Sequence, residues 1–202
     1  MSSTATAARR TAVIAKWVAV PAALLLSGAI IANASYSAFS ATTSNSADNW
    51  AAGTVALTDD DSSAALFTAS NLKPGSTGTK CIVVSSTGSL PSLVKLYGTG
   101  AATTNALSSS INLTVTQGTG GSFGSCTGFT ALSSGASVFS GTLAGFGSSA
   151  TGYANGLGNW APTGAATETR TYQFTYTVDS AAPNTTQGGT ASIGFTWETQ
   201  NS

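Results

Sequence analysis

The residue types that support catalysis are scarce in this chain, and histidine is absent altogether. A Ser-His-Asp triad, a Cys-His pair and an H-E-x-x-H zinc site all need histidine, so none of them can form. The two glutamates, Glu168 and Glu198, lie in or beside expected strands, while most aspartates lie in expected turns. A glycosidase-type pair needs two carboxyl groups facing each other across a cleft, which this distribution disfavours. The sequence therefore predicts a protein that is not an enzyme, with no catalytic residue, cofactor or metal.

Two other groups of residues are weak candidates for binding sites. Asp59, Asp60 and Asp61 form a compact acidic cluster, and Ca²⁺ prefers several carboxylate and carbonyl oxygens. The spaced D-x-D-x-D-G pattern of a calcium loop is missing, which favours a solvated turn. Trp50 and Trp160 each follow an asparagine and are candidates for stacking on a sugar ring. Packing in the core is the commoner role for such aromatic residues.

Residues 1–34 are organised like a signal peptide for export. Basic residues between positions 9 and 16 precede an apolar run of about 14 residues, which is shorter than the roughly 20 residues of a membrane span. Ala32 and Ala34 form an A-x-A pattern that predicts cleavage before Ser35. An uncleaved anchor is the alternative. We expect a secreted, extracellular or surface-displayed protein that meets a membrane only through the signal peptide before cleavage.

Cys81 and Cys126 are the two cysteines, and both lie in the part predicted to be exported. An even number of cysteines in an oxidising compartment favours a disulfide over two buried free thiols. A catalytic thiol lacks a histidine base. For their separation of 45 residues, a chain-entropy model gives about 4 kcal/mol of stabilisation. The sequence therefore predicts one disulfide between these cysteines.

The composition restricts both the domain count and the partners. After cleavage 168 residues remain, which is enough for one domain with a core and too few for two comfortable ones. Residues 35–202 are therefore expected to form a single domain. Charged residues make up 7% of the chain, and the exported part has four basic and seven acidic residues. No Lys/Arg patch of the kind needed to bind nucleic acid is present, so nucleic acid is not an expected partner.

Alternation of apolar and polar residues predicts strands through most of the exported part. The first expected strand, residues 36–40, begins almost at the new N-terminus and can pair with its own sheet or with that of a neighbour. Later strands are expected at residues 53–58, 65–68, 79–85, 90–97, 111–116, 172–178 and 193–197. The last two of these are expected to form a hairpin with a long loop, residues 179–189. The expected fold is all-β, a two-sheet antiparallel β-sandwich of the jelly-roll type, after an N-terminal helical signal peptide.

The segment 118–169 is rich in glycine, with bulky residues at isolated positions. This pattern predicts loops and short strands covering one end of a sandwich. Well-spaced aromatic residues argue against simple disorder. Residues 136–146 are the one stretch expected to hold a short helix.

Residues 39–57 resemble the start of the mature TasA/camelysin family. Phe39-Ser40-Ala41-Thr42-Thr43 is similar to its A-x-F-S-x-T strand, and Asn49-Trp50 followed by Ala52-Gly53-Thr54-Val55-Ala56-Leu57 is similar to its asparagine-aromatic pair and A-G-T-[LV]-x-L pattern. Asn71–Gly75 resembles its L-x-P-G turn, and Ser86–Leu90 resembles its N-T-G-S-L segment. The signal peptide looks like the type that a dedicated signal peptidase handles in that family. The resemblance covers about residues 20–97, and the remainder looks more like actinobacterial secreted relatives.

The resemblance implies a jelly-roll domain exported to the cell surface, where some family members assemble into biofilm-matrix fibres. In that assembly the N-terminal strand completes the sheet of a neighbouring molecule. The matching positions here are Ser35–Ala41, including Tyr36, Ala38 and Phe39. Camelysin members are described as metallo-endopeptidases, but the absence of histidine means that this activity is not carried over; zinc held by acids alone would be unusual.

Three functional interpretations follow, in this order of preference. The first is a secreted, non-catalytic structural protein of the cell surface or biofilm matrix, which self-associates or binds other matrix proteins through its N-terminal strand. The second is a carbohydrate-binding or adhesive surface module, for which an exposed Trp50, Tyr153 or Trp160 would be evidence. The third is a camelysin-like metallo-endopeptidase.

Overall fold

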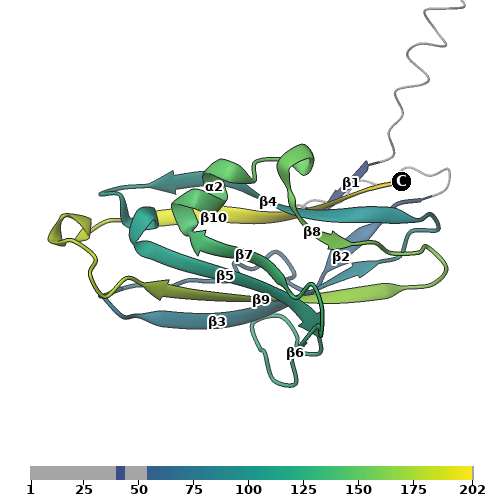
Figure 1. Ribbon diagram of the computed structural model, residues 1–202, viewed down its shortest axis with the longest axis horizontal. Coiled ribbons are helices and arrows are strands. Elements are labelled where there is room, and N and C mark those ends of the chain that lie inside the picture. The colour runs from purple at the N-terminus through teal and green to yellow at the C-terminus, as the bar shows by residue number, and fades with distance from the viewer. Residues whose placement is uncertain (1–39, 44–53, 202) are drawn as a thin grey trace, which may run out of the picture. The chain divides into compact units, whose positions relative to one another are not determined.

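The computed structural model describes residues 40–43 and 54–201, which form two antiparallel sheets packed face to face (Figure 1). Sheet A contains, in spatial order, β1 (Ser40–Thr43), β10 (Ala191–Asn201), β4 (Ser92–Thr103) and β8 (Leu157–Trp160). Sheet B contains β2 (Leu57–Asp59), β3 (Thr77–Ser86), β9 (Glu168–Val178) and β5 (Ile111–Thr119), with β6 (Thr130–Ala131) and β7 (Ser137–Thr142) both paired to β5. The predicted all-β two-sheet antiparallel sandwich is confirmed.

The strand order is that of a jelly roll. Without the short strands β2 and β6, the orders are β1-β10-β4-β8 in sheet A and β3-β9-β5-β7 in sheet B. Numbered consecutively along the chain, these eight strands read 1-8-3-6 and 2-7-4-5, which is jelly-roll connectivity. The chain changes sheet at nearly every connection, so strands distant in sequence become neighbours. The N-terminal strand therefore lies beside the C-terminal strand.

The core lies between the sheets and is dominated by aromatic rings from β9 and β10. Tyr172 and Phe174 face inward from β9, and Phe195 and Trp197 face them from β10. The ring centroids of Phe174 and Phe195 are 4.5 Å apart, and those of Tyr172 and Trp197 are 5.3 Å apart. Phe146 is fully buried between the sheets and joins this stack through Phe195 at 5.5 Å. Period-two alternation thus puts one apolar face of each strand into a shared core.

The expected hairpin between β9 and β10 is wrong. β9 belongs to sheet B and β10 to sheet A, so the segment 179–189 crosses from one sheet to the other. This segment includes the short 3₁₀ helix η3 (Asn184–Thr186). The physical reason is the aromatic packing, because rings that contact one another across the core must come from opposite sheets. Hairpin neighbours would present the same rings side by side on one surface.

Two local expectations also need correction. Residues 65–68 form no strand; instead Leu66 and Phe67 pack on the core, with the Phe67 ring 5.2 Å from that of Tyr176. The expected helix at 136–146 begins later: β7 runs to Thr142, whose hydroxyl accepts a hydrogen bond from the Gly145 N–H at 3.0 Å. This cap starts the helix α2 (Leu143–Ser149). The remaining helical turns are η1 (Leu107–Ser110) and η2 (Tyr153–Asn155).

Within residues 40–43 and 54–201, no helix has the length and apolar character required to cross a membrane.

Candidate functional site at the sheet edges

The strand β1 forms one edge of sheet A. It pairs antiparallel with β10, from Ser40 opposite Gln200 to Thr43 opposite Trp197. Of the predicted assembly strand, only Ser40 and Ala41 belong to the described residues. Tyr36, Ala38 and Phe39, as well as the predicted cleavage positions Ala32, Ala34 and Ser35, lie outside them. The first described strand of the chain is therefore an edge strand.

The described part of β1 pairs with one end of β10. β10 has 11 residues, and β1 pairs with the four from Trp197 to Gln200. The segment 191–196 of β10 has β4 on one side and, among the described strands, none on the other. Its sequence, ASIGFT, carries no charge. We call this segment the open β10 edge; it presents backbone groups of the kind that pair with an added strand.

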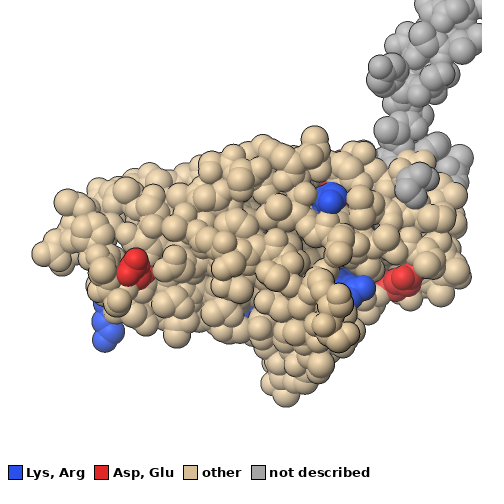
Figure 2. Space-filling model, viewed as in Figure 1, with Lys and Arg blue, Asp and Glu red and all other residues tan. Residues whose placement is uncertain are grey.

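Charged side chains are sparse on the face of the molecule drawn in Figure 2. Figure 2 shows acidic and basic side chains sparsely scattered over the viewed face, with large uncharged areas between them. Proteins commonly protect exposed strand edges with charged side chains, lysine above all. The open β10 edge has no such protection in its own sequence.

A hydrogen-bonded group of side chains lies on the outer face of sheet A beside β1. The carboxylate of Glu198 accepts hydrogen bonds from the Tyr97 hydroxyl and from the Gln200 side-chain amide, both at 2.9 Å. Burial and this carboxylate raise the pKa of Tyr97 to about 12. Because Glu198 is also the backbone partner of Thr42, this group lies at the junction between β1 and the sheet.

The inner face at the same junction contains polar atoms inside the core. Trp197 and Thr199 are 2% and 0% exposed, and among the described residues the Thr199 Oγ1 has no hydrogen-bond partner. Their backbone partners in β1 are Thr43 and Ala41. Burying an unpaired polar atom costs free energy. The Thr199 hydroxyl is therefore an unsatisfied buried group beneath β1.

A hollow of about 240 Å³ lies at the end of the open β10 edge, where α2 approaches β4. Its wall includes Ser192 and Ile193 of β10. The other lining residues are small or apolar: Ala101, Ala102, Thr103, Ser108, Leu143, Ala144, Gly147 and Ser148. The wall has no ionisable side chain, so the hollow has no group that could serve as an acid, a base or an ion ligand.

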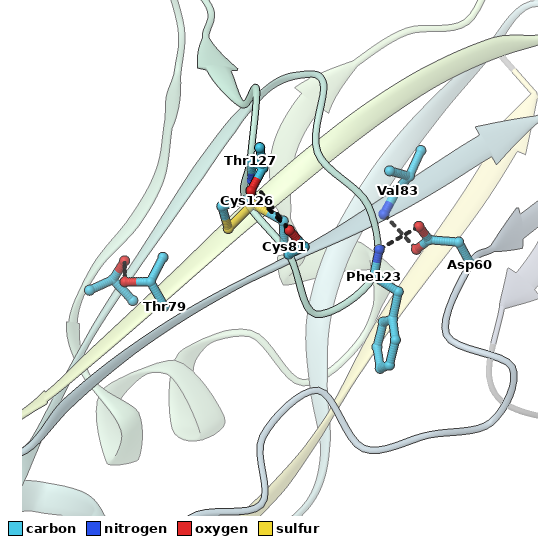
Figure 3. The surroundings of a disulfide bond; sticks show 9 residues. Asp60, Thr79, Cys81, Val83, Phe123, Cys126 and Thr127 are labelled. Carbon is cyan, nitrogen blue, oxygen red and sulfur yellow. Dashed lines mark hydrogen bonds between the residues drawn. A yellow bond between two sulfur atoms is a disulfide. The ribbon is translucent and has the colours of Figure 1, made fainter.

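The predicted disulfide is confirmed. Cys81 comes from β3 and Cys126 from the loop between β5 and β6, with Cα atoms 5.1 Å apart (Figure 3). Cys81 is completely buried because this loop covers the outer face of β3. The run of apolar residues from Cys81 to Val84 is explained in the same way: Ile82 and Val84 face the core, while the loop lies over Cys81.

The three aspartates of the acidic cluster make different local contacts. Asp60 accepts hydrogen bonds from two backbone amides, the Val83 N–H at 2.8 Å and the Phe123 N–H at 2.7 Å (Figure 3). Asp61 accepts the Ser63 N–H at 2.7 Å, and desolvation raises its pKa. Across residues 40–43 and 54–201, no three side chains of the His, Cys, Asp and Glu types gather as metal ligands would. The contacts of Asp60 could not be predicted from the sequence, because both donors are distant along the chain.

The described candidates for sugar stacking are occupied by contacts within the protein. Trp160 is 4% exposed, and the Arg170 guanidinium lies 5.8 Å from its ring centroid. The Tyr153 hydroxyl donates a hydrogen bond to the Leu93 carbonyl at 2.9 Å. Trp50 lies outside the described residues. A free aromatic platform for sugar is therefore not present at Trp160.

The two glutamates do not form a pair. Glu168 begins β9 in sheet B, where its carboxylate accepts hydrogen bonds from the Thr163 backbone and hydroxyl, and these contacts lower its pKa. Glu198 lies in β10 of sheet A. The two carboxyl groups thus serve separate local networks.

No model of a known protein family matches this chain, and a comparison with curated proteins finds no match.

Proposed function

We propose that this is an exported, non-catalytic structural protein of the cell surface or extracellular matrix, which self-associates through its N-terminal strand. One observation carries the proposal: the first described strand pairs with four of the eleven residues of β10 and leaves the open β10 edge beside it. β1 is an edge strand of sheet A, and a neighbour's strand can compete with it for the same edge of β10.

The chemistry of the surroundings supports a role in association more than one in catalysis or ligand binding. The open β10 edge is uncharged, and the hollow at its end has no ionisable lining residue. The resemblance of residues 39–57 to the TasA/camelysin family, and the predicted signal peptide, support export and matrix assembly. A carbohydrate-binding or adhesive module is the alternative proposal, with Trp50 as its remaining aromatic candidate.

The test compares the chain beginning at Ser35 with a variant in which Ser35–Ala41 are replaced by seven Gly and Ser residues. Size-exclusion chromatography and negative-stain microscopy at rising concentration should show oligomers or fibres for the first chain. The replacement keeps the length but removes the strand pattern, so it should remain a folded monomer, as judged by circular dichroism. Polymers in both chains would contradict strand donation. A monomer at every concentration in both chains would contradict the matrix proposal and direct the next test to glycan binding.

A further inference from the structure

The edge of sheet B at β3 has a sequence that is prone to association between molecules. β2 pairs only with Val84–Ser86, which leaves residues 77–83 of β3 without a described strand partner on that side. The run Cys81-Ile82-Val83-Val84 is apolar and mostly β-branched, and Lys80 is the one charged residue of β3. Segments of this kind pair readily with copies of themselves when they are exposed.

Two other parts of the chain cover this edge, the Asp60 side chain and the backbone of the loop 120–127. Asp60 accepts the Val83 N–H through Oδ1 and the Phe123 N–H through Oδ2, and so links β3 to the loop 120–127 (Figure 3). The Gly124 N–H of that loop donates to the Cys81 carbonyl at 2.8 Å. In an antiparallel strand, alternate residues present both backbone groups to the same side. The covered groups of Cys81 and Val83 are therefore ones that an added strand would use.

The disulfide holds the loop in this position. Cys126 follows Gly124 by two residues and is bonded to Cys81 of β3 itself. The loop thus has three attachments to the edge or to Asp60, namely the disulfide, the Gly124 N–H and the Phe123 N–H. Loss of one attachment leaves the loop tethered by the others.

We propose that Asp60, the loop 120–127 and the disulfide act together as an edge guard, which prevents a second copy of this chain from pairing along β3. Without the edge guard, β3 would pair with the β3 of a second copy. Antiparallel pairing of two identical edges is self-complementary and closes as a dimer. The edge guard does not depend on donation of the N-terminal strand. If that donation occurs, the guard directs assembly to sheet A.

The first test measures whether Asp60 protects the edge. Asp60→Ala should increase amide hydrogen exchange at Val83 and Phe123 by about tenfold or more, because each amide loses a charged acceptor. Asp179→Ala is the matched control: it removes the same charge and an acceptor of the Ala181 N–H at 2.8 Å, and it lies by the Thr77 end of β3, away from Val83. Unchanged exchange at Val83 in Asp60→Ala would overturn the role of Asp60.

The second test measures association after the guard is removed. Asp60→Ala combined with Cys81→Ser and Cys126→Ser should self-associate, by sedimentation velocity, at concentrations about tenfold or more below those of the wild type. Adding Val83→Lys to this variant should restore wild-type behaviour, because it places charge on the β3 edge. If the triple variant does not fold, Asp60→Ala alone, which uncovers the Val83 N–H while the disulfide still holds the loop, should associate at lower concentration than Asp179→Ala, and equal association of these two variants would overturn the proposal. A folded unguarded variant with wild-type association, or association that Val83→Lys does not reduce, would overturn the proposal.

The same variants separate the edge guard from the proposed function. Association along β3 should persist when residues 35–41 are replaced by Gly and Ser, whereas assembly through the N-terminal strand should disappear. Association of the unguarded variant that disappears with this replacement would contradict the edge guard and support strand donation alone.

Discussion

At the residue scale, two threonines of β10 differ in how their hydroxyls are satisfied. Thr196 and Thr199 are 3% and 0% exposed. The Thr196 hydroxyl forms a hydrogen bond with the Thr99 hydroxyl at 3.3 Å, whereas the Thr199 Oγ1 has no partner among the described residues. Valine has the same shape as threonine without the polar atom, so the two positions form a matched pair.

Thr199→Val should raise the free energy of unfolding by about 1 kcal/mol, because it removes a buried polar atom that forms no hydrogen bond. Thr196→Val should lower it by about 1 kcal/mol, because it removes the hydrogen bond between the Thr196 and Thr99 hydroxyls. Urea unfolding followed by tryptophan fluorescence measures both values. Shifts of the same sign in the two variants would contradict this account of the β10 interior.

Tyr97 should make the protein sensitive to alkaline pH. Its hydroxyl donates to Glu198, and its pKa in the folded protein is raised from 10.0 to about 12. The folded state therefore binds the phenolic proton more tightly than the unfolded state does. This stabilisation is complete below pH 10 and is lost as the pH rises from 10 to about 12.

The measurement is urea unfolding at several pH values, for the wild type and for Tyr97→Phe. The wild type should lose stability between pH 10 and about 12 more steeply than the variant. Equal slopes would show that the Tyr97–Glu198 hydrogen bond does not contribute to this pH dependence.

At the scale of elements, β10 connects the core to the candidate assembly surface. Its inward-facing residues form part of the aromatic stack. Along one side of the strand, Trp197–Gln200 pair with β1, and residues 191–196 form the open β10 edge. Ser192 is exposed in that edge. A positive charge there discourages the approach of another strand and has little effect on the fold of the isolated molecule.

Ser192→Lys should weaken self-association, measured as the oligomer fraction by size-exclusion chromatography, with a change in the free energy of unfolding of about 0.5 kcal/mol or less. Ser180→Lys is the matched control, because Ser180 is also exposed but lies in the connection after β9. Equal association in the two variants would place the assembly surface elsewhere than the open β10 edge.

At the scale of the whole molecule, the disulfide joins β3 to the loop between β5 and β6, and the two cysteines are 45 residues apart. Replacement of Cys81 and Cys126 by serine should lower the free energy of unfolding by about 4 kcal/mol, because the unfolded chain regains the freedom of an open loop. Urea unfolding of this variant and of the reduced wild type should give similar values. A loss well below this in both proteins would show that the loop 120–127 is held mainly by its hydrogen bonds.

The strands with the clearest alternation were predicted well from the sequence. In β9, Tyr172, Phe174 and Val178 face the core as period-two alternation requires, and the same holds for Phe195 and Trp197 of β10. Residues 65–68 were not predicted correctly, since a short apolar run also fits a loop that packs side chains on the core. Local pattern determines which face of a segment is buried, but it does not distinguish a strand from such a loop.

The sequence by itself determined the all-β class, the burial of alternating faces and the disulfide, because these follow from local periodicity and from the presence of just two cysteines. The tertiary structure alone decided that β9 and β10 lie in opposite sheets, that β1 pairs with β10 at the edge of sheet A, and that Asp60 reaches Val83 and Phe123. The physical reason is that strand partners and backbone acceptors are chosen across the core, between segments that a local pattern cannot connect.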